Sequence, residues 1–195
     1  MIAEDEFIGE FPQENYTIHK KYIETEVEQI RLYHTRYSPR DPKFTICIIH
    51  GFGEHSTRFK SVADFFACRN FEVLTVDLRG FGYSGGARGC AEVRELENDV
   101  IHTLKTARAD LPLFLYAHSL GGLVIIKLLL ERPELNVSGC IVTSPLLGLT
   151  KNMEFNWAKR MAIHYLGDDL SDFIVNSRVN PTALTKKTKF LHTIF

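Results

Sequence analysis

The chain has 195 residues, of which 45% are apolar and 24% are charged. This composition is that of an ordinary globular protein, and the length is sufficient for one domain with a substantial core. The net charge of −1 creates no bulk electrostatic field that would attract nucleic acid or an anionic membrane, so we expect no nucleic-acid partner.

The N-terminus and the cysteines favour a protein of a reducing, cytoplasmic compartment. Residues 1–10 are acidic and lack the basic and apolar stretches of a secretory signal. The most apolar segment, Gly121–Leu130, is too short to span a bilayer. The four cysteines have no zinc-ligand spacing, and we expect reduced thiols, with Cys47 and Cys140 buried in strands. We expect no metal ion and no cofactor.

The first half of the chain predicts two opening strands followed by a buried one. Polar residues alternate with apolar or β-branched ones, which predicts strands at Tyr16–Glu24 and Gln29–Arg36. The nearly continuous apolar run Phe44–Ile49 is typical of a strand buried on both faces. A helix, a strand and a glycine-rich loop are then expected at Ser56–Asn70, Glu72–Val76 and Asp77–Gly89.

The second half continues the alternation of helices and strands up to residue 143. Apolar residues at helical spacing predict a helix at Glu92–Ala109. A strand, a helix and a strand follow at Leu113–Tyr116, Gly121–Arg132 and Val137–Thr143. This alternation favours an α/β fold, a mostly parallel sheet with helices on both faces. The last strand would form an edge, at which Ile141 and Val142 face solvent or another chain.

After residue 150 the alternation gives way to helical patterns. Asn152–Leu166 has an apolar stripe typical of a helix, and Thr182–Phe195 resembles the start of another. No further strand follows. We therefore expect residues 1–150 to form the N-terminal part of an α/β core and residues 151–195 to form a separate helical region.

The most informative stretch is a sharp turn centred on Ser119, between the strand Leu113–Tyr116 and a helix. A nucleophile elbow has this arrangement, because the strained turn lifts the serine hydroxyl clear of the sheet. The residues two before and two after the serine must be small, and they are Ala117 and Gly121. The helix N-terminus makes the N–H of Leu120 a candidate oxyanion donor. A tight turn without chemistry is the alternative.

Two glycine-rich loops follow the ends of neighbouring strands. His50–His55 follows a buried strand, where the second oxyanion donor of such a site lies, and the N–H of Phe52 is the candidate. A simple turn is again the alternative. Asp77–Gly89 follows the next strand, and we expect it to be scaffold, with Asp77 accepting hydrogen bonds from N–H groups of the loop.

Three motifs in order resemble one branch of a known family. His50–Phe59, Asp77–Gly89 and His118–Gly122 are similar to motifs of the monoacylglycerol lipase and lysophospholipase-like branch of the α/β-hydrolases. That branch is often catalogued with the serine aminopeptidase-like hydrolases. The resemblance runs from about residue 16 to residue 191, and it implies an α/β-hydrolase fold with Ser119 as the nucleophile.

The resemblance also implies roles for other residues. The backbone N–H groups of Phe52 and Leu120 would form the oxyanion hole. Glu54 and Arg58 would lie near the polar, glycerol-binding end of the pocket. The region after residue 150 resembles a cap over an acyl channel, with ordinary packing onto the core as the alternative. Its relevant apolar residues are Phe155, Trp157 and Met161.

In this family a catalytic Asp and a catalytic His follow the cap, and no segment of this sequence resembles them. His118 adjoins the serine, His55 has no group to position it as a base, and the remaining candidates, His164 and His192, lie in cap-like sequence. We therefore expect no complete triad and no final strands of the fold in these residues. Without a general base, a serine hydroxyl is a weak nucleophile. Our hypothesis is a truncated form of a longer enzyme.

Two functions from different classes follow. The first is a serine ester hydrolase that releases a fatty acid from a glycerol ester through an acyl-Ser119 intermediate, with a monoacylglycerol-like or lysophospholipid-like substrate. The second is a non-catalytic homologue that binds a lipid or a partner protein. A lipid substrate would permit peripheral membrane contact through the apolar face of the cap.

Overall fold

The structure is a computed structural model, and it describes residues 15–26 and 29–147. In these residues strands and helices alternate as the sequence pattern predicts. The strands are β1 (Tyr16–Glu24), β2 (Arg31–Pro39), β3 (Phe44–Ile49), β4 (Phe71–Val76), β5 (Leu113–His118) and β6 (Gly139–Thr143). The helices are the 3-10 helix η2 (Ser56–Phe59), α1 (Lys60–Ala67), α2 (Val93–Leu104) and α3 (Leu120–Glu131).

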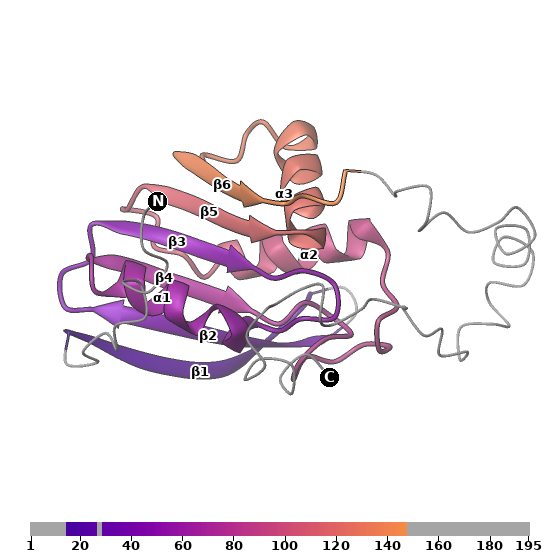
Figure 1. Cartoon of the computed structure of the whole chain (residues 1–195), viewed down its shortest axis with the longest axis horizontal. Helices are drawn as coiled ribbons and strands as arrows, with labels where there is room; N and C mark the ends of the chain where they lie inside the picture. Colours follow the sequence, from indigo (N-terminus) through magenta and orange to yellow (C-terminus); the bar gives the residue numbers. More distant parts are fainter. Residues whose placement is uncertain (1–14, 27–28, 148–195) are drawn as a thin grey trace, which may run out of the picture. The chain divides into compact units, whose positions relative to one another are not determined.

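The strands form one twisted sheet in the order β1-β2-β4-β3-β5-β6 (Figure 1). The pairs β1–β2 and β2–β4 are antiparallel. The pairs β4–β3, β3–β5 and β5–β6 are parallel. Parallel neighbours require long crossover connections, and the helices form part of these. The predicted α/β fold with a mostly parallel sheet is confirmed.

Helices cover both faces of the sheet, which explains the continuous apolar run of β3. On one face, Ile46 and Ile48 pack in a cluster with residues of α1. On the other face, which α2 and α3 cover (Figure 1), Cys47 and Ile49 pack in a second cluster with residues of these helices. All four side chains are buried. Burial also raises the pKa of the Cys47 thiol to about 12, so this cysteine is an inert, protonated core residue.

Some predicted boundaries are wrong because of left-handed backbone positions. Gln29 has a φ of 52° and Asn70 a φ of 59°, and neither conformation continues a strand or a helix. As a result, β2 begins at Arg31 and α1 ends at Ala67. The ends of α2 and β5 and the start of β6 also differ from the predicted bounds.

Among the described strands β6 pairs only with β5, so it forms one edge of the described sheet. The expected exposure of Ile141 is confirmed, at 47%. Val142 is half-buried instead, because it packs on α3: its Cγ1 lies 2.8 Å from where a Cβ on Gly122 would lie. Cys140 is exposed and not buried as expected, although it lies on the same face of β6 as Val142.

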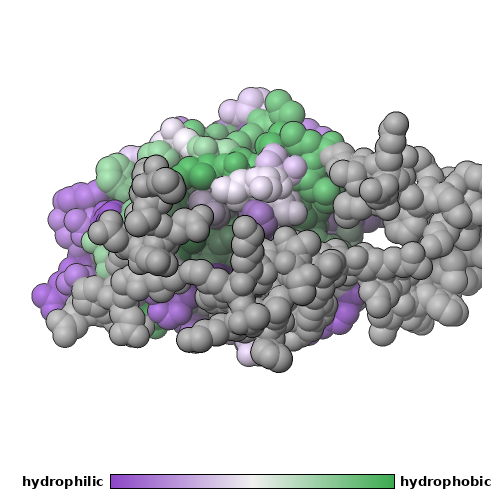
Figure 2. Space-filling view, viewed as in Figure 1, coloured by the Kyte–Doolittle hydropathy of each residue, from purple (hydrophilic) through white to green (hydrophobic). Residues whose placement is uncertain are grey.

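The two edges of the described sheet differ in polarity. Apolar surface gathers over β6 and α3 (Figure 2). There Leu130 is 78% exposed, in addition to Ile141. At the opposite edge, β1 exposes the polar side chains of His19, Lys20 and Lys21. Edge strands with charged side chains resist pairing with other chains, so the two edges are not equivalent.

The predicted helical region, residues 151–195, lies outside the described residues. Three expectations therefore stay predictions: the division of the chain at residue 150, the cap, and the absence of the final strands. Within the described ranges, no helix has the length and apolar character needed to cross a bilayer. The predicted cap and histidine residues outside these ranges are Phe155, Trp157, Met161, His164 and His192.

Candidate active site

The backbone of Ser119 lies in a strained conformation between β5 and α3. Its φ of 51° and ψ of −113° are unfavourable for a residue with a side chain, at a cost of about 1–3 kcal/mol. Three hydrogen bonds hold it: its N–H donates to the Thr143 carbonyl at 3.0 Å, and its carbonyl accepts from Leu123 and Leu146 N–H at 3.1 and 3.0 Å. The strand, strained serine and helix therefore have the arrangement predicted for an elbow.

The small residues on either side of Ser119 allow the strand and helix to approach their neighbours. Ala117 is completely buried, so its methyl group fits in the small space at this position. A Cβ on Gly121 would lie 2.6 Å from the His50 carbonyl oxygen and 2.7 Å from the Ile49 carbonyl oxygen. Because these are backbone atoms, only glycine fits at this position.

The loop after β3 lies directly against the elbow, as the motif predicts. A Cβ on Gly51 would lie 3.0 Å from the Ser119 Cβ. The loop turns through Gly53, whose φ is 70°. Leu120 is the first residue of α3, so its N–H has no partner within the helix. The use of the Phe52 and Leu120 N–H groups as an oxyanion hole stays a prediction.

Glu54 and Arg58, both predicted to bind substrate, lie together beside this loop. Glu54 Oε1 is 3.4 Å from Arg58 Nε. Glu54 Oε2 accepts the Gly51 N–H at 2.8 Å. The Glu54 side chain is mostly buried, at 16% exposure, whereas Arg58 is an exposed residue whose side chain is 27% exposed. The pair thus stabilises the loop as well, a role that the sequence motif did not indicate.

His50 is a structural residue of this loop that sequence reasoning did not assign. Its ring is 1% exposed, and its Nε2 accepts the Leu78 N–H at 3.0 Å. Its Nδ1 therefore carries the proton and donates to the Gly51 carbonyl at 2.7 Å. Burial lowers the His50 pKa, which keeps the ring neutral. His50 thereby joins the loops that follow β3 and β4.

Asp77 has the scaffold role that was predicted for it. Its carboxylate accepts the Ser56 N–H at 2.7 Å and the Tyr83 N–H at 2.9 Å. Its backbone carbonyl accepts the Ser84 hydroxyl. Asp77 is completely buried, so these bonds fix the start of η2 and the glycine-rich loop after β4 in one arrangement.

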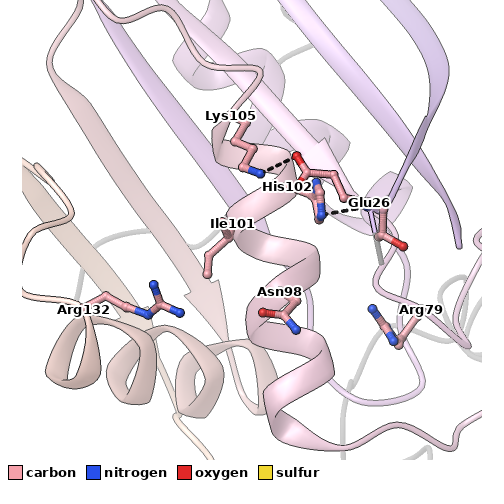
Figure 3. A pocket seen from close by; sticks show the side chains of 8 residues that line it. Glu26, Arg79, Asn98, Ile101, His102, Lys105 and Arg132 are labelled. Atoms are coloured by element: carbon pink, nitrogen blue, oxygen red, sulfur yellow. Dashed lines mark hydrogen bonds and ion pairs between the residues drawn. The ribbon is translucent and has the colours of Figure 1, made fainter. Parts of the chain in front are cut away.

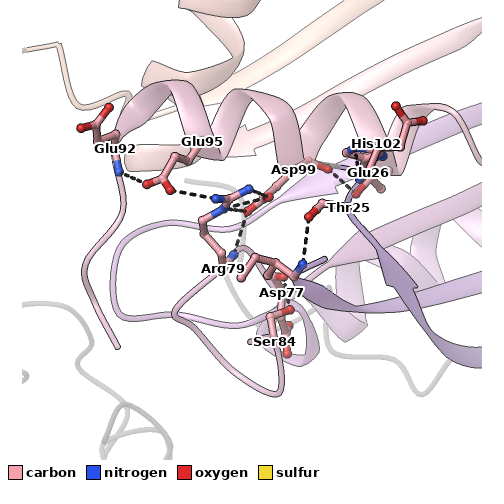
Figure 4. A network of polar contacts seen from close by, with 11 residues as sticks. Thr25, Glu26, Asp77, Arg79, Ser84, Glu92, Glu95, Asp99 and His102 are labelled. Carbon is pink, nitrogen blue, oxygen red and sulfur yellow. Dashed lines mark hydrogen bonds and ion pairs between the residues drawn. The ribbon is translucent and has the colours of Figure 1, made fainter. Parts of the chain in front are cut away.

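A buried ion-pair network joins this loop to α2 (Figure 4). Arg79 donates to Asp99 through Nη2 at 2.7 Å and Nε at 3.0 Å, and to Glu95 through Nη1 at 2.9 Å. The Arg79 backbone N–H donates to the same Asp99 carboxylate at 2.9 Å. Asp99 is fully buried and Arg79 is 4% exposed. No pattern in the sequence had indicated this pair, because its members are distant in the chain.

None of the histidines near the elbow hydrogen-bonds the Ser119 hydroxyl within the described ranges. His118 Nδ1 lies 3.0 Å from the Thr143 hydroxyl. His55 Nδ1 lies 2.6 Å from the Thr57 hydroxyl. In these ranges there is also no group of three or more His, Cys, Asp or Glu side chains that could hold a metal ion.

A cavity of about 360 Å³ lies between the β1–β2 turn, α2 and the end of α3 (Figure 3). Its cations are paired: Lys105 is 2.6 Å from Glu26, and Arg79 bonds Asp99. No residue of the elbow or of the loop after β3 lines this cavity, so it is not the pocket for an ester at Ser119. Its lining residues are Thr25, Glu26, Arg79, Asn98, Ile101, His102, Lys105 and Arg132.

Comparison with known proteins identifies the family. The family described as "Serine aminopeptidase, S33" matches residues 40–194, most of the chain. The chain belongs to this family. Its curated relatives include a putative monoglyceride lipase of Schizosaccharomyces pombe, 30% identical over 152 residues, which are 74% of this chain and 40% of the relative. The monoglyceride lipase of Homo sapiens is 34% identical over 110 residues, 54% of this chain and 36% of the relative.

Solved structures show the same fold. A soluble variant of monoglyceride lipase from Saccharomyces cerevisiae, in complex with a substrate analogue, matches with a TM-score of 0.72 and 18% identity. The match covers 95% of this chain and 63% of that one. The protein is therefore a monoglyceride lipase-like α/β-hydrolase. It spans less than half the length of the two curated relatives above.

Proposed function

We propose that this protein is a serine ester hydrolase that releases a fatty acid from a monoacylglycerol-like or lysophospholipid-like ester. The observation that carries the proposal is the strained Ser119, with a φ of 51°, held between β5 and α3 against the Gly51 loop. Strain of this kind persists only where the surroundings enforce it, and it clusters at active sites. Membership of a family with monoglyceride lipase relatives supports the same substrate class.

In the proposed reaction, Ser119 Oγ attacks the acyl carbon while its proton passes to a general base. The N–H groups of Phe52 and Leu120 stabilise the resulting oxyanion. The ester C–O bond then breaks, and the glycerol oxygen leaves with that proton. Water attacks the acyl-serine by the same route and releases the fatty acid. Glu54 and Arg58 bind the polar end of the substrate.

The proposed mechanism requires a base and an orienting acid from residues outside the described ranges. The nearby histidines within those ranges are engaged elsewhere: His50 with backbone groups, His55 with Thr57 and His118 with Thr143. The cap over the acyl chain and peripheral contact with a membrane are parts of the proposal that rest on the resemblance. The proposed cytoplasmic location rests on the acidic N-terminus and the scattered cysteines.

A Ser119→Ala variant tests the proposal. With a general base from outside the described ranges in reach of Ser119, we expect wild-type protein to hydrolyse a monoacylglycerol and a short-chain chromogenic ester. The variant should lose at least about a thousandfold in kcat. Ser61→Ala, which changes an exposed serine of α1, is the matched control and should keep full activity. A Ser119→Ala variant that retains wild-type turnover would disprove the role of this residue.

The second candidate is a non-catalytic lipid-binding homologue, and the lack of a described base at Ser119 favours it. The same variants separate the two functions. If wild-type protein shows no turnover, and if both wild type and Ser119→Ala bind a non-hydrolysable monoacylglycerol ether with equal affinity, the binding function is supported and the hydrolase proposal fails.

A further inference from the structure

Thr143, the last residue of β6, contacts the residues on both sides of the elbow. Its carbonyl accepts the Ser119 N–H at 3.0 Å. Its hydroxyl donates to the Ala117 carbonyl at 3.3 Å and lies 3.0 Å from His118 Nδ1. His118 and Thr143 are register partners in the parallel pair β5–β6, so regular sheet pairing sets this geometry.

The single hydroxyl proton sets the direction of these hydrogen bonds. When the Thr143 hydroxyl donates to Ala117, it can only accept from His118, so Nδ1 of that ring carries the proton. The opposite edge of the ring, which carries Cδ2, faces the loop after β3. Its Cδ2 lies 3.4 Å from where a Cβ on Gly51 would lie.

The chain beyond Thr143 returns to the elbow and closes it. Ser144 has a φ of 44°, so the backbone turns sharply directly after the strand. This turn brings the Leu146 N–H to the Ser119 carbonyl at 3.0 Å. The N–H and the carbonyl of Ser119 thus both hydrogen-bond to the segment that Thr143 begins. A shift of β6 would break these two hydrogen bonds.

We propose that Thr143 is a positioning residue for the nucleophile. Its carbonyl holds the Ser119 backbone, and its hydroxyl fixes the tautomer and orientation of His118 against the loop that carries the Phe52 N–H. Thr143 touches no reacting atom and acts only through the elbow and His118. The effect on rate rests on the proposed hydrolase function, whereas the effect on His118 does not.

The test compares three variants of the full chain. Thr143→Val keeps the carbonyl and the shape and removes the hydroxyl, and Thr143→Ser restores the hydroxyl. Thr103→Val is the matched control, because the buried Thr103 hydroxyl donates to a backbone carbonyl, that of Asp99, at 2.9 Å within α2. It reports the general effect of losing a buried threonine hydrogen bond away from the elbow.

We expect Thr143→Val to lower kcat for a monoacylglycerol on the order of tenfold to a hundredfold, with KM changed less than about twofold, because positioning and not binding is lost. Thr143→Ser should recover most of this loss, and Thr103→Val should show none of it. A Thr143→Val variant with wild-type kcat, or a Thr143→Ser variant as slow as Thr143→Val, would overturn the proposal.

Nitrogen-15 NMR of the histidine rings gives a readout that does not depend on turnover. We expect the Nδ1–H tautomer of His118 in wild type, Thr143→Ser and Thr103→Val, and a changed tautomer population in Thr143→Val. The same His118 signals in all four proteins would contradict the assignment. If wild type shows no turnover, the proposed hydrolase function fails, and the NMR comparison alone decides the role of Thr143.

Discussion

The space around Gly121 determines how closely the nucleophile and the loop after β3 approach each other. A Cβ added there meets two backbone carbonyl oxygens of the segment that ends β3, at 2.6 and 2.7 Å. Backbone atoms cannot move aside as a flexible side chain can. We therefore expect Gly121→Ala to lower the free energy of unfolding by about 1–3 kcal/mol, as overpacking does, which urea denaturation would measure.

Gly85→Ala is the matched control for this substitution. The nearest atoms to a Cβ on Gly85 are backbone atoms of Arg31 at 3.6 Å, an ordinary contact distance, and its φ is not in the left-handed region. Its unfolding midpoint should stay close to that of wild type. If Gly121→Ala were as stable as Gly85→Ala, the close packing of α3 on β3 would be wrong.

Among single residues, the sequence predicted the sharp turn at Ser119 but not the hydrogen bonds that hold the neighbouring loop. Ser119 could be found because an elbow imposes small residues at fixed spacing along the chain. The hydrogen bonds of His50 to Gly51 and Leu78 could not, since a histidine after a strand has no periodic pattern that distinguishes a structural residue from a catalytic one. Glu54 was expected to bind substrate, yet its bond to the Gly51 N–H depends on a loop conformation.

Between elements, the Arg79–Asp99 pair is the main polar link of the loop after β4 to α2. Removing one partner of a buried ion pair leaves the other charge without compensation, which typically costs about 3–5 kcal/mol. We expect Arg79→Met to lower the free energy of unfolding by about this amount in urea denaturation at pH 7. The loop should also become more susceptible to proteolysis.

Arg94→Met, at an exposed position of α2, is the control and should change the free energy of unfolding by less than about 0.5 kcal/mol. Equal costs for the two variants would show that the network contributes no more than a surface charge. Replacing both Arg79 and Asp99 by apolar residues should cost less than Arg79→Met alone, because no buried charge is then left unpaired.

The predicted elements agree with the structure where apolar patterning alone determines them. The run Phe44–Ile49 was predicted without error, because burial on both faces makes the whole strand apolar. The start of β2 near Gln29 and the end of α1 near Asn70 were predicted wrongly. Residues other than glycine that adopt a left-handed conformation are hard to recognise from a sequence. Val142 and Cys140 were misjudged because no sequence pattern shows how far along an edge strand a neighbouring helix packs.

Over the whole described molecule, the sheet has one charged edge and one apolar edge. Lys20 and Lys21 protect β1, whereas β6 exposes Ile141 with no charged side chain in the strand. Unprotected edges favour pairing with other chains. We expect Ile141→Lys to raise the concentration at which this 195-residue chain self-associates, as measured by size-exclusion chromatography with light scattering.

Leu130→Lys is the control, since Leu130 is also apolar and exposed but lies on α3 and offers no strand edge. It should reduce self-association less than Ile141→Lys does. Equal effects of the two variants would mean that general apolar surface, and not the strand edge, drives association.

The closure of the elbow by β6 has a consequence for the folding of the protein. The Ser119 backbone is fixed by Thr143 and Leu146, which belong to a segment that follows the elbow in the chain and is synthesised after it. Contacts between distant parts of a chain form slowly, because loop closure must precede them. The strained serine geometry therefore cannot exist in a folding intermediate in which β6 has not yet joined the sheet. Under the proposed hydrolase function, capture of Ser119 by a fluorophosphonate during refolding would date the completion of the sheet.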